Sequence, residues 1–239
     1  MSWLKGRVKR RWKIAAGVLA LLVAGSAGGG VWLLSAMRTA EFWEPKILEF
    51  EQADRETPPE PGAIVFTGSS SIVMWSTLAE DMAPMRVLNR GFGGSQIDHV
   101  NHYAKRIVVP YEPSAVVLYA GDNDLASGSD KTPSVVFEDF RRFVEIVHAA
   151  KPGTPVYFLA IKPSLSRWDR WGLMREANAL IAAFAEKTEA VEYVDVATPM
   201  LGDDGEPRPD LFVMDGLHMN EAGYRLWTSI VRPVLLPAE

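Results

Sequence analysis

The sequence predicts a three-layer α/β/α fold in which helices cover both faces of a five-stranded parallel sheet. The first observation is an alternation: five short runs of apolar and β-branched residues are each followed by a longer amphipathic segment. The second is that four of these runs are followed by segments rich in glycine or in Ser, Asn, Asp and His. In a parallel sheet such segments meet beyond the carboxyl ends of the strands, where α/β proteins bind ligands.

Each predicted strand is followed by its own predicted helix. The strands are expected at 63–67, 86–89, 115–119, 156–160 and 191–196. The helices are expected at 72–78, 96–108, 134–150, 173–187 and 221–230. Upstream, a proline-rich stretch at 57–62 ends a short predicted helix in the segment 41–54, where apolar residues recur near helical spacing.

The first 37 residues differ in composition from the rest of the chain. Six of the 25 basic residues lie between Lys5 and Lys13, and the first acidic residue is Glu41. The 21 residues Ile14–Leu34 carry no charge, which is close to the roughly 20 that a membrane-spanning helix needs. The basic flank predicts an uncleaved signal-anchor in a bacterial-type inner membrane, with the rest of the chain on the periplasmic or extracellular side. A cleaved signal peptide, cut near Ala24 and releasing a secreted protein, is the alternative.

The sequence therefore divides into a basic tail with its anchor or signal peptide (1–37), a linker with a short helix (38–62) and one folded domain (63–239). Beyond Lys13 the chain holds 19 basic against 30 acidic residues, which argues against nucleic acid as a partner. It has no cysteine, so disulfides and thiolate metal sites are excluded. Nothing in the sequence specifies an oligomeric state.

Three consecutive serines follow the first predicted strand and its terminal glycine, Gly68. They precede a short amphipathic run, so they are expected at a helix N-terminus, where backbone N–H groups are unpaired and negative charge is favoured. A serine cluster at this place is also typical of simple helix capping. The remaining loops distinguish the two interpretations.

The last of the four loops contains Asp215 and, three residues later, His218. At this spacing the carboxylate can turn back onto the imidazole, select its tautomer and stabilise its charged form. A histidine held in this way is suited to act as a general base for a nucleophile. A surface loop followed by a helix that starts at Asn220 is the alternative.

The second and third loops offer hydrogen-bond donors. The glycine-dense stretch from Gly91 to Ser95 can expose backbone N–H groups to an oxyanion, or form a flexible turn. It does not fit the dinucleotide-binding fingerprint, because Gln96 stands at the place of the third glycine. In the third loop Asn123 offers a side-chain amide as a further donor, although a plain turn is the alternative.

Together, these four loops resemble the four sequence blocks of the SGNH/GDSL hydrolases, a family of serine esterases. The resemblance extends from Ala63 to the C-terminus with block order and spacing intact. It implies a flavodoxin-like SGNH hydrolase fold, with no cofactor and no metal. The residues it implies are a catalytic triad of Ser70, Asp215 and His218 and an oxyanion hole formed by the N–H groups of Ser70 and Gly94 and the Asn123 amide.

Two positions depart from the family pattern. Ser69 stands where the family has the Asp of Gly-Asp-Ser, so the three adjacent serines leave the nucleophile ambiguous. Ser95 replaces an acidic residue that is common after the oxyanion-hole glycine. Ile72 also rules out a Gly-x-Ser-x-Gly motif around Ser70, which argues against the nucleophile elbow of the other common serine-esterase fold.

The resemblance implies a serine esterase that hydrolyses carboxylic esters, with short acyl or aryl groups, through an acyl-enzyme on Ser70. A carbohydrate O-acetylesterase of the cell envelope and a non-catalytic envelope binding module are the alternatives. The expected partners are a small ester or acylated glycan and, through the N-terminal helix, the membrane. Trp168 and Trp171 follow the fourth strand and either bind substrate or cover the sheet.

Two rival interpretations involve other titratable residues. Asp98, His99 and His102 could share one helix face and bind a metal, although a solvated face is the expectation. Asp195 ends the fifth strand and competes with Asp215 as the partner of His218. The spacing of Asp215 is the better one.

Overall fold

A computed structural model describes residues 37–236 of the 239-residue chain. The predicted anchor or signal peptide, Ile14–Leu34, lies outside the described residues. Between residues 37 and 236 no helix is long and apolar enough to cross a membrane. The chain divides into two units, Met1–Phe42 and Trp43–Glu239, and the five strands found among the described residues lie in the second.

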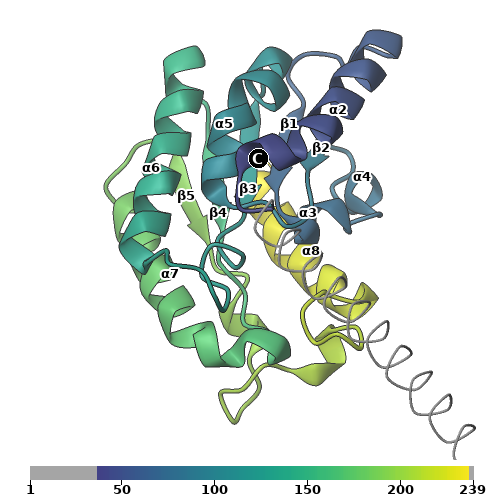
Figure 1. Ribbon diagram of the computed structural model, residues 1–239. Helices are drawn as coiled ribbons and strands as arrows, with labels where there is room; N and C mark the ends of the chain where they lie inside the picture. The colour runs from purple at the N-terminus through teal and green to yellow at the C-terminus, as the bar shows by residue number, and fades with distance from the viewer. Residues whose placement is uncertain (1–36, 237–239) are drawn as a thin grey trace, which may run out of the picture. The chain divides into compact units, whose positions relative to one another are not determined.

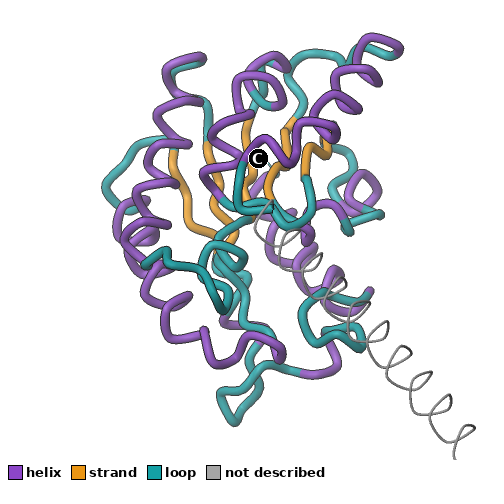
Figure 2. Tube along the Cα trace, viewed as in Figure 1, coloured by secondary structure: helices purple, strands orange, loops and turns teal. Residues whose placement is uncertain are grey.

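The second unit is built on one parallel sheet (Figures 1 and 2). Its strands are β1 (Ile64–Gly68), β2 (Val87–Gly91), β3 (Ala115–Tyr119), β4 (Val156–Leu159) and β5 (Val191–Val194). They lie in the order β2-β1-β3-β4-β5, and every neighbouring pair is parallel. This is the flavodoxin-like strand order, so the predicted fold class is confirmed.

The register brings the strand ends to one edge. Gly68 of β1 pairs with Gly91 of β2 on one side and with Tyr119 of β3 on the other. The loops that follow these three residues therefore start side by side. The chain reverses its winding between β1 and β3, which is where doubly wound sheets form their binding crevice.

Helices cover both faces of the sheet (Figure 2). The α-helices are α2 (Glu44–Glu56), α3 (Ser70–Val73), α4 (Leu78–Asp81), α5 (Ile97–Ile107), α6 (Pro133–Ala150), α7 (Trp171–Ala185) and α8 (Glu221–Leu235). Short 3-10 segments are η1 (Ala40–Trp43), η2 (Val109–Tyr111), η3 (Leu165–Arg170), η4 (Thr198–Met200) and η5 (Pro209–Leu211).

Aromatic side chains fill the core on both faces. On one face Tyr119 of β3 packs against Trp227 of α8 with ring centroids 4.9 Å apart, and Trp75 packs against the same indole at 5.9 Å. On the other face Phe140 of α6 contacts Phe158 of β4 at 4.9 Å. Burial of such rings contributes about 1.5–3 kcal/mol each relative to leaving them exposed.

Two predicted helices differ from the structure. The helix expected at 72–78 is instead two short helices, α3 and α4, separated by a turn around the buried Trp75. The last helix does not end at 230 but continues through Pro233 to Leu235. The continuation buries Val231 and Leu235 against the sheet, which offsets the backbone hydrogen bond that proline cannot donate.

The helix expected in the linker is present as α2, and it packs on α5. Arg106 of α5 donates to Glu51 at 2.7 Å and to Glu44 at 2.8 Å. Asp54, near the end of α2, pairs with the buried Arg90 of β2 and accepts from Tyr111. Ion pairs and a hydrogen bond thus attach α2 to α5, β2 and η2.

Candidate active site

The first site loop separates three adjacent serines by burial. Gly68 ends β1 at φ +124° and Ser69 is extended, so that α3 begins at Ser70. Ser69 and Ser71 are buried, at 0% and 2% exposure, while Ser70 is partly exposed. Ser70 is therefore the serine of the three that solvent reaches.

Asp215, His218 and Ser70 form one continuous chain of hydrogen-bonding contacts. His218 Nδ1 lies 2.6 Å from Asp215 Oδ2, and His218 Nε2 lies 3.0 Å from Ser70 Oγ. The other carboxylate oxygen, Asp215 Oδ1, accepts from the N–H groups of Leu217 at 2.8 Å and His218 at 2.9 Å. The turn that the Asp-x-x-His spacing predicts is thus present, and its imidazole faces the serine.

The contacts of Asp215 determine its charge. Its hydrogen bonds to the imidazole and to the two backbone N–H groups lower the pKa of the carboxyl to about 2. Asp215 is therefore a carboxylate over the neutral pH range. A carboxylate only accepts, so it selects the tautomer with the proton on Nδ1, which leaves the Nε2 lone pair directed at the Ser70 hydroxyl.

Asp195 is excluded as the partner of His218. Its Oδ1 accepts from the backbone N–H groups of Ala197 at 3.0 Å and Thr198 at 2.9 Å. This arrangement caps the short η4 segment after β5. The spacing of the sequence favoured Asp215 over Asp195 as the partner of His218, and this geometry agrees with it.

The two donor loops lie beside the serine. The Phe92 N–H donates to the Gly68 carbonyl at 2.8 Å, which attaches the glycine-rich loop to the end of β1. Gly93 lies against Ser70, since a Cβ at Gly93 would be 3.8 Å from the Ser70 Cβ. Asn123 Nδ2 donates to the Ser95 carbonyl at 3.1 Å, so its amide reaches the residue that follows Gly94.

The glycine-rich loop and the Asn123 amide thus meet next to the exposed end of α3. The Ser70 N–H belongs to the first turn of this helix, where backbone N–H groups have no intrahelical partner. One edge of the sheet thus carries three kinds of donor able to stabilise an oxyanion: the Ser70 N–H, the glycine-rich loop and the Asn123 amide.

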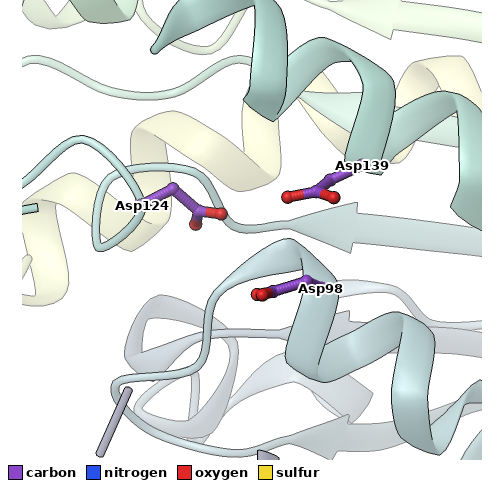
Figure 3. A group of neighbouring side chains, drawn as sticks. All are labelled: Asp98, Asp124 and Asp139. Atoms are coloured by element: carbon purple, nitrogen blue, oxygen red, sulfur yellow. The ribbon is translucent and has the colours of Figure 1, made fainter. Parts of the chain in front are cut away.

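Three carboxylates outside this site face one another (Figure 3). They are Asp98 of α5, Asp124 of the loop after β3 and Asp139 of α6. Lys131 Nζ lies 2.9, 3.1 and 2.8 Å from them, respectively. The ammonium group occupies the position that a cation would take, so the cluster is an ion-pair network that joins α5 to α6.

The histidines of α5 do not share one face. His99 is buried, and its Nδ1 accepts from Trp43 Nε1 and from the Gln96 N–H, both at 3.2 Å. His102 is exposed on the same helix. The rival metal interpretation of Asp98, His99 and His102 finds no support in this geometry.

Lys131→Met is expected to destabilise the protein by about 3 kcal/mol at neutral pH, because the buried Asp124 loses its counter-ion. Burial raises the pKa of Asp124 to about 6 even with Lys131 beside it. Because this folded-state pKa is raised, stability is lost as pH rises through it, and the variant should recover part of its deficit near pH 5. Thermal unfolding at pH 5 and 7 measures both effects.

Lys46→Met is the matched control, because Lys46 pairs with Glu49 on an exposed surface. We expect it to change the free energy of unfolding by less than about 1 kcal/mol. An equal loss in the two variants would contradict the assignment of Lys131 to a buried network.

Apolar residues that the sequence analysis did not single out flank both catalytic loops. Val73 and Met74 follow the serine in α3 and the next turn, and Val213 and Met214 precede Asp215. All four are exposed, Met214 fully. The signal that could have found Val213 and Met214 is their apolar character in a segment expected to be a polar loop, whereas Val73 and Met74 lie in the amphipathic segment expected at 72–78.

The two tryptophans of the candidate substrate site stack on each other. The ring centroids of Trp168 and Trp171 are 6.0 Å apart, with 19° between the ring planes. Both side chains are partly buried, and Trp171 also packs against the core. Trp168 lies in η3, next to Arg167, whose guanidinium reaches Asn123.

A doubly wound parallel sheet with a Ser–His–Asp arrangement at its carboxyl edge defines a class, the α/β enzymes that hydrolyse ester bonds. Residues 62–226 match the model of the GDSL-like lipase/acylhydrolase family. The chain belongs to this family and is an ester-bond hydrolase.

Solved structures share the fold. A protein from Streptococcus pneumonia, described as a proposed platelet activating factor, superposes with a TM-score of 0.71 at 19% identity, covering 87% of this chain and 96% of that one. A GDSL-like lipase from Bacteroides thetaiotaomicron superposes with a TM-score of 0.64 at 18% identity, covering 83% of this chain and 97% of that one.

A mutant of an acetyl-xylooligosaccharide esterase from Geobacillus Stearmophilus gives a TM-score of 0.60 at 15% identity, covering 75% of this chain and 98% of that one. No curated protein matches the chain. At identities this low, the likeness to these solved structures shows a shared fold alone.

Proposed function

We propose that this protein is a serine esterase that hydrolyses carboxylic esters with short acyl or aryl groups through an acyl-enzyme on Ser70. The observation that carries the proposal is the continuous arrangement of Asp215, His218 and Ser70, with contacts of 2.6 and 3.0 Å. A non-catalytic binding module has no use for a serine hydroxyl directed at an oriented imidazole.

The mechanism follows from the groups. His218 Nε2 takes the Ser70 proton as the oxygen attacks the ester carbonyl, and Asp215 stabilises the imidazolium that forms. The N–H groups of Ser70 and Gly94 and the Asn123 amide hold the developing oxyanion. His218 then protonates the leaving alcohol, and a water molecule repeats the cycle on the acyl-enzyme.

The surroundings of the site favour an apolar acyl or aryl group. Val73, Met74, Val213 and Met214 lie next to the catalytic residues in sequence and are exposed. Apolar surface that is exposed beside a catalytic centre gains free energy when a substrate group covers it, by about 25 cal/mol per Å².

A carbohydrate O-acetylesterase is the second candidate, and the stacked pair of Trp168 and Trp171 favours it. Flat indole faces near a catalytic loop suit the apolar face of a sugar ring. An acetyl-xylooligosaccharide esterase among the structural neighbours and an acetyl esterase, crystallised as a mutant with acetate, are consistent with a small acyl group.

We also propose that residues 1–37 tether the domain to the outer side of a bacterial-type inner membrane. The support is the composition of the sequence alone: the uncharged run Ile14–Leu34 behind a basic flank. Secretion after cleavage of a signal peptide is the alternative.

The experiment that tests the activity combines a fluorophosphonate probe with three substrates: 4-nitrophenyl acetate, 4-nitrophenyl butyrate and an acetylated xylooligosaccharide. Labelling together with turnover of the nitrophenyl esters supports the main proposal. Labelling with turnover of the acetylated oligosaccharide alone moves the assignment to the second candidate. Absence of both labelling and turnover would show that the site is not a serine esterase.

The rate is expected to fall at acid pH, because protonated His218 cannot accept the Ser70 proton. Asp215, with a pKa of about 2, stays ionised throughout this range and does not contribute to the fall. A profile of kcat/KM against pH for 4-nitrophenyl acetate measures the effect. A rate that is flat from roughly pH 5 to 9 would argue against histidine as the base.

A further inference from the structure

Arg167 of η3 contacts the loop that carries Asn123. Its Nη2 donates to Asn123 Oδ1 at 3.0 Å, and its Nη1 lies 3.2 Å from Asp122 Oδ2. The Arg167 side chain is only 19% exposed and that of Asp122 only 4%. The guanidinium therefore bridges two consecutive side chains of the third site loop, in surroundings that are largely screened from water.

The bridge determines how the Asn123 amide is turned. A guanidinium only donates hydrogen bonds, so the group that faces Arg167 has to be the amide oxygen. The amide nitrogen then faces the opposite way, where it donates to the Ser95 carbonyl at 3.1 Å. A flipped amide would set N–H against guanidinium N–H and oxygen against the carbonyl oxygen of Ser95, so both contacts oppose the flip.

The guanidinium is itself held in place. Lys162 Nζ lies 3.8 Å from Asp122 Oδ2 in the same buried region, so two cations lie beside this one carboxylate oxygen. The Ser166 N–H, one residue before Arg167, donates to the Gly216 carbonyl at 3.0 Å. The segment that carries Arg167 is thus hydrogen-bonded to the loop that carries Asp215 and His218.

We propose that Arg167 is a positioning residue of the oxyanion hole: it turns the Asn123 amide so that an Nδ2 hydrogen is presented to the oxyanion. The inference rests on the proposed function and names a residue that acts on the substrate only through another. One Nδ2 hydrogen is engaged by Ser95, and the second serves the substrate oxygen.

Arg167→Met in the full chain removes the hydrogen bond to Asn123 and the charge beside Asp122, and it keeps a long side chain. Loss of one oxyanion donor costs on the order of 10²–10³ in kcat, and a misplaced donor loses part of this, so we expect kcat to fall about 10- to 100-fold. KM should change less than about threefold, because the amide acts in the transition state.

A double-mutant cycle with Asn123→Ala separates positioning from general damage. If Arg167 acts through Asn123, Arg167→Met lowers kcat by less than about threefold once the amide is gone. If the role of Arg167 is merely structural, Arg167→Met lowers kcat by the same factor with Asn123 present and with Asn123→Ala. That result would overturn the proposal. Should Arg167→Met not fold, the cycle is run with Arg167→Lys, which keeps a cation beside Asp122 but loses the planar fork that reaches both side chains.

The matched control is Arg170→Met. Arg170 belongs to the same segment, and its Nε donates to the Leu125 carbonyl at 2.9 Å, so the variant loses a comparable contact without touching Asn123. We expect its kcat to stay within about threefold of the wild type. An equal fall in both variants would assign the effect to the segment as a whole and overturn the proposal.

A readout that needs no turnover is the heteronuclear ¹H–¹⁵N NOE of the Asn123 side-chain amide. We expect a rigid amide in the wild type and in Arg170→Met, and a mobile one in Arg167→Met. An amide equally rigid in all three would contradict the proposal. If the wild type hydrolyses no ester, the proposed function fails while this measurement still decides the role of Arg167.

Discussion

Ser70→Ala is expected to lower kcat for 4-nitrophenyl acetate by on the order of 10⁴–10⁶ and to abolish labelling by a fluorophosphonate probe. The alanine leaves His218 and its 2.6 Å contact to Asp215 in place but removes the oxygen that forms the acyl-enzyme. The fold should be unaffected, because Ser70 is partly exposed. Thermal unfolding of the variant verifies this point beside the kinetics.

The neighbouring serines provide matched controls. Ser69 and Ser71 are buried and flank the reactive position, so Ser69→Ala and Ser71→Ala change the same loop without removing the hydroxyl beside His218. Both variants should keep kcat within about tenfold. Full activity in Ser70→Ala, with loss in one of the other two, would move the nucleophile and contradict the mechanism.

Gly68→Ala is expected to destabilise the protein by about 3 kcal/mol or more, because a Cβ has no room there. At φ +124° the backbone is in a region that side chains rarely adopt, and an added Cβ would lie 1.9 Å from the Tyr119 carbonyl oxygen. The strand cannot move aside, since β1 is paired on one side with β2 and on the other with β3.

Gly153→Ala separates steric overlap from backbone strain. Gly153 also has a positive φ, +76°, but nothing lies within 4 Å of an added Cβ. We expect a loss of about 1–2 kcal/mol from the left-handed conformation alone. At about 2–4 °C per kcal/mol, thermal unfolding resolves the two variants, and equal shifts would show that the Tyr119 contact is relieved by relaxation.

The sequence determined the elements whose causes are local. Three of the five strands begin at the predicted residue and the other two begin one residue later, because β-branched and apolar runs between turns locate a strand to within a few residues. The Asp215–His218 contact was equally predictable, since one turn of four residues forms it. These statements needed no knowledge of distant residues.

Other parts of the fold escaped local reasoning. The helix after the serines divides at Trp75 because that indole is buried beneath Tyr224 and Trp227, residues near the other end of the chain. Pro233 marks a local helix end, yet α8 continues because Val231 and Leu235 are buried. In both places long-range packing outweighs a local preference.

The sequence by itself therefore determined the fold class and the four loops that meet at the site. Only the tertiary structure decided which serine meets the histidine, because Ser70 and His218 are 148 residues apart and burial of Ser69 and Ser71 depends on the whole sheet. Likewise, only the tertiary structure could bring Arg167 to Asn123, which lies 44 residues away in the sequence. The physical reason is that propensity and spacing act over a few residues, whereas side chains from different strands meet only after the sheet has set their register.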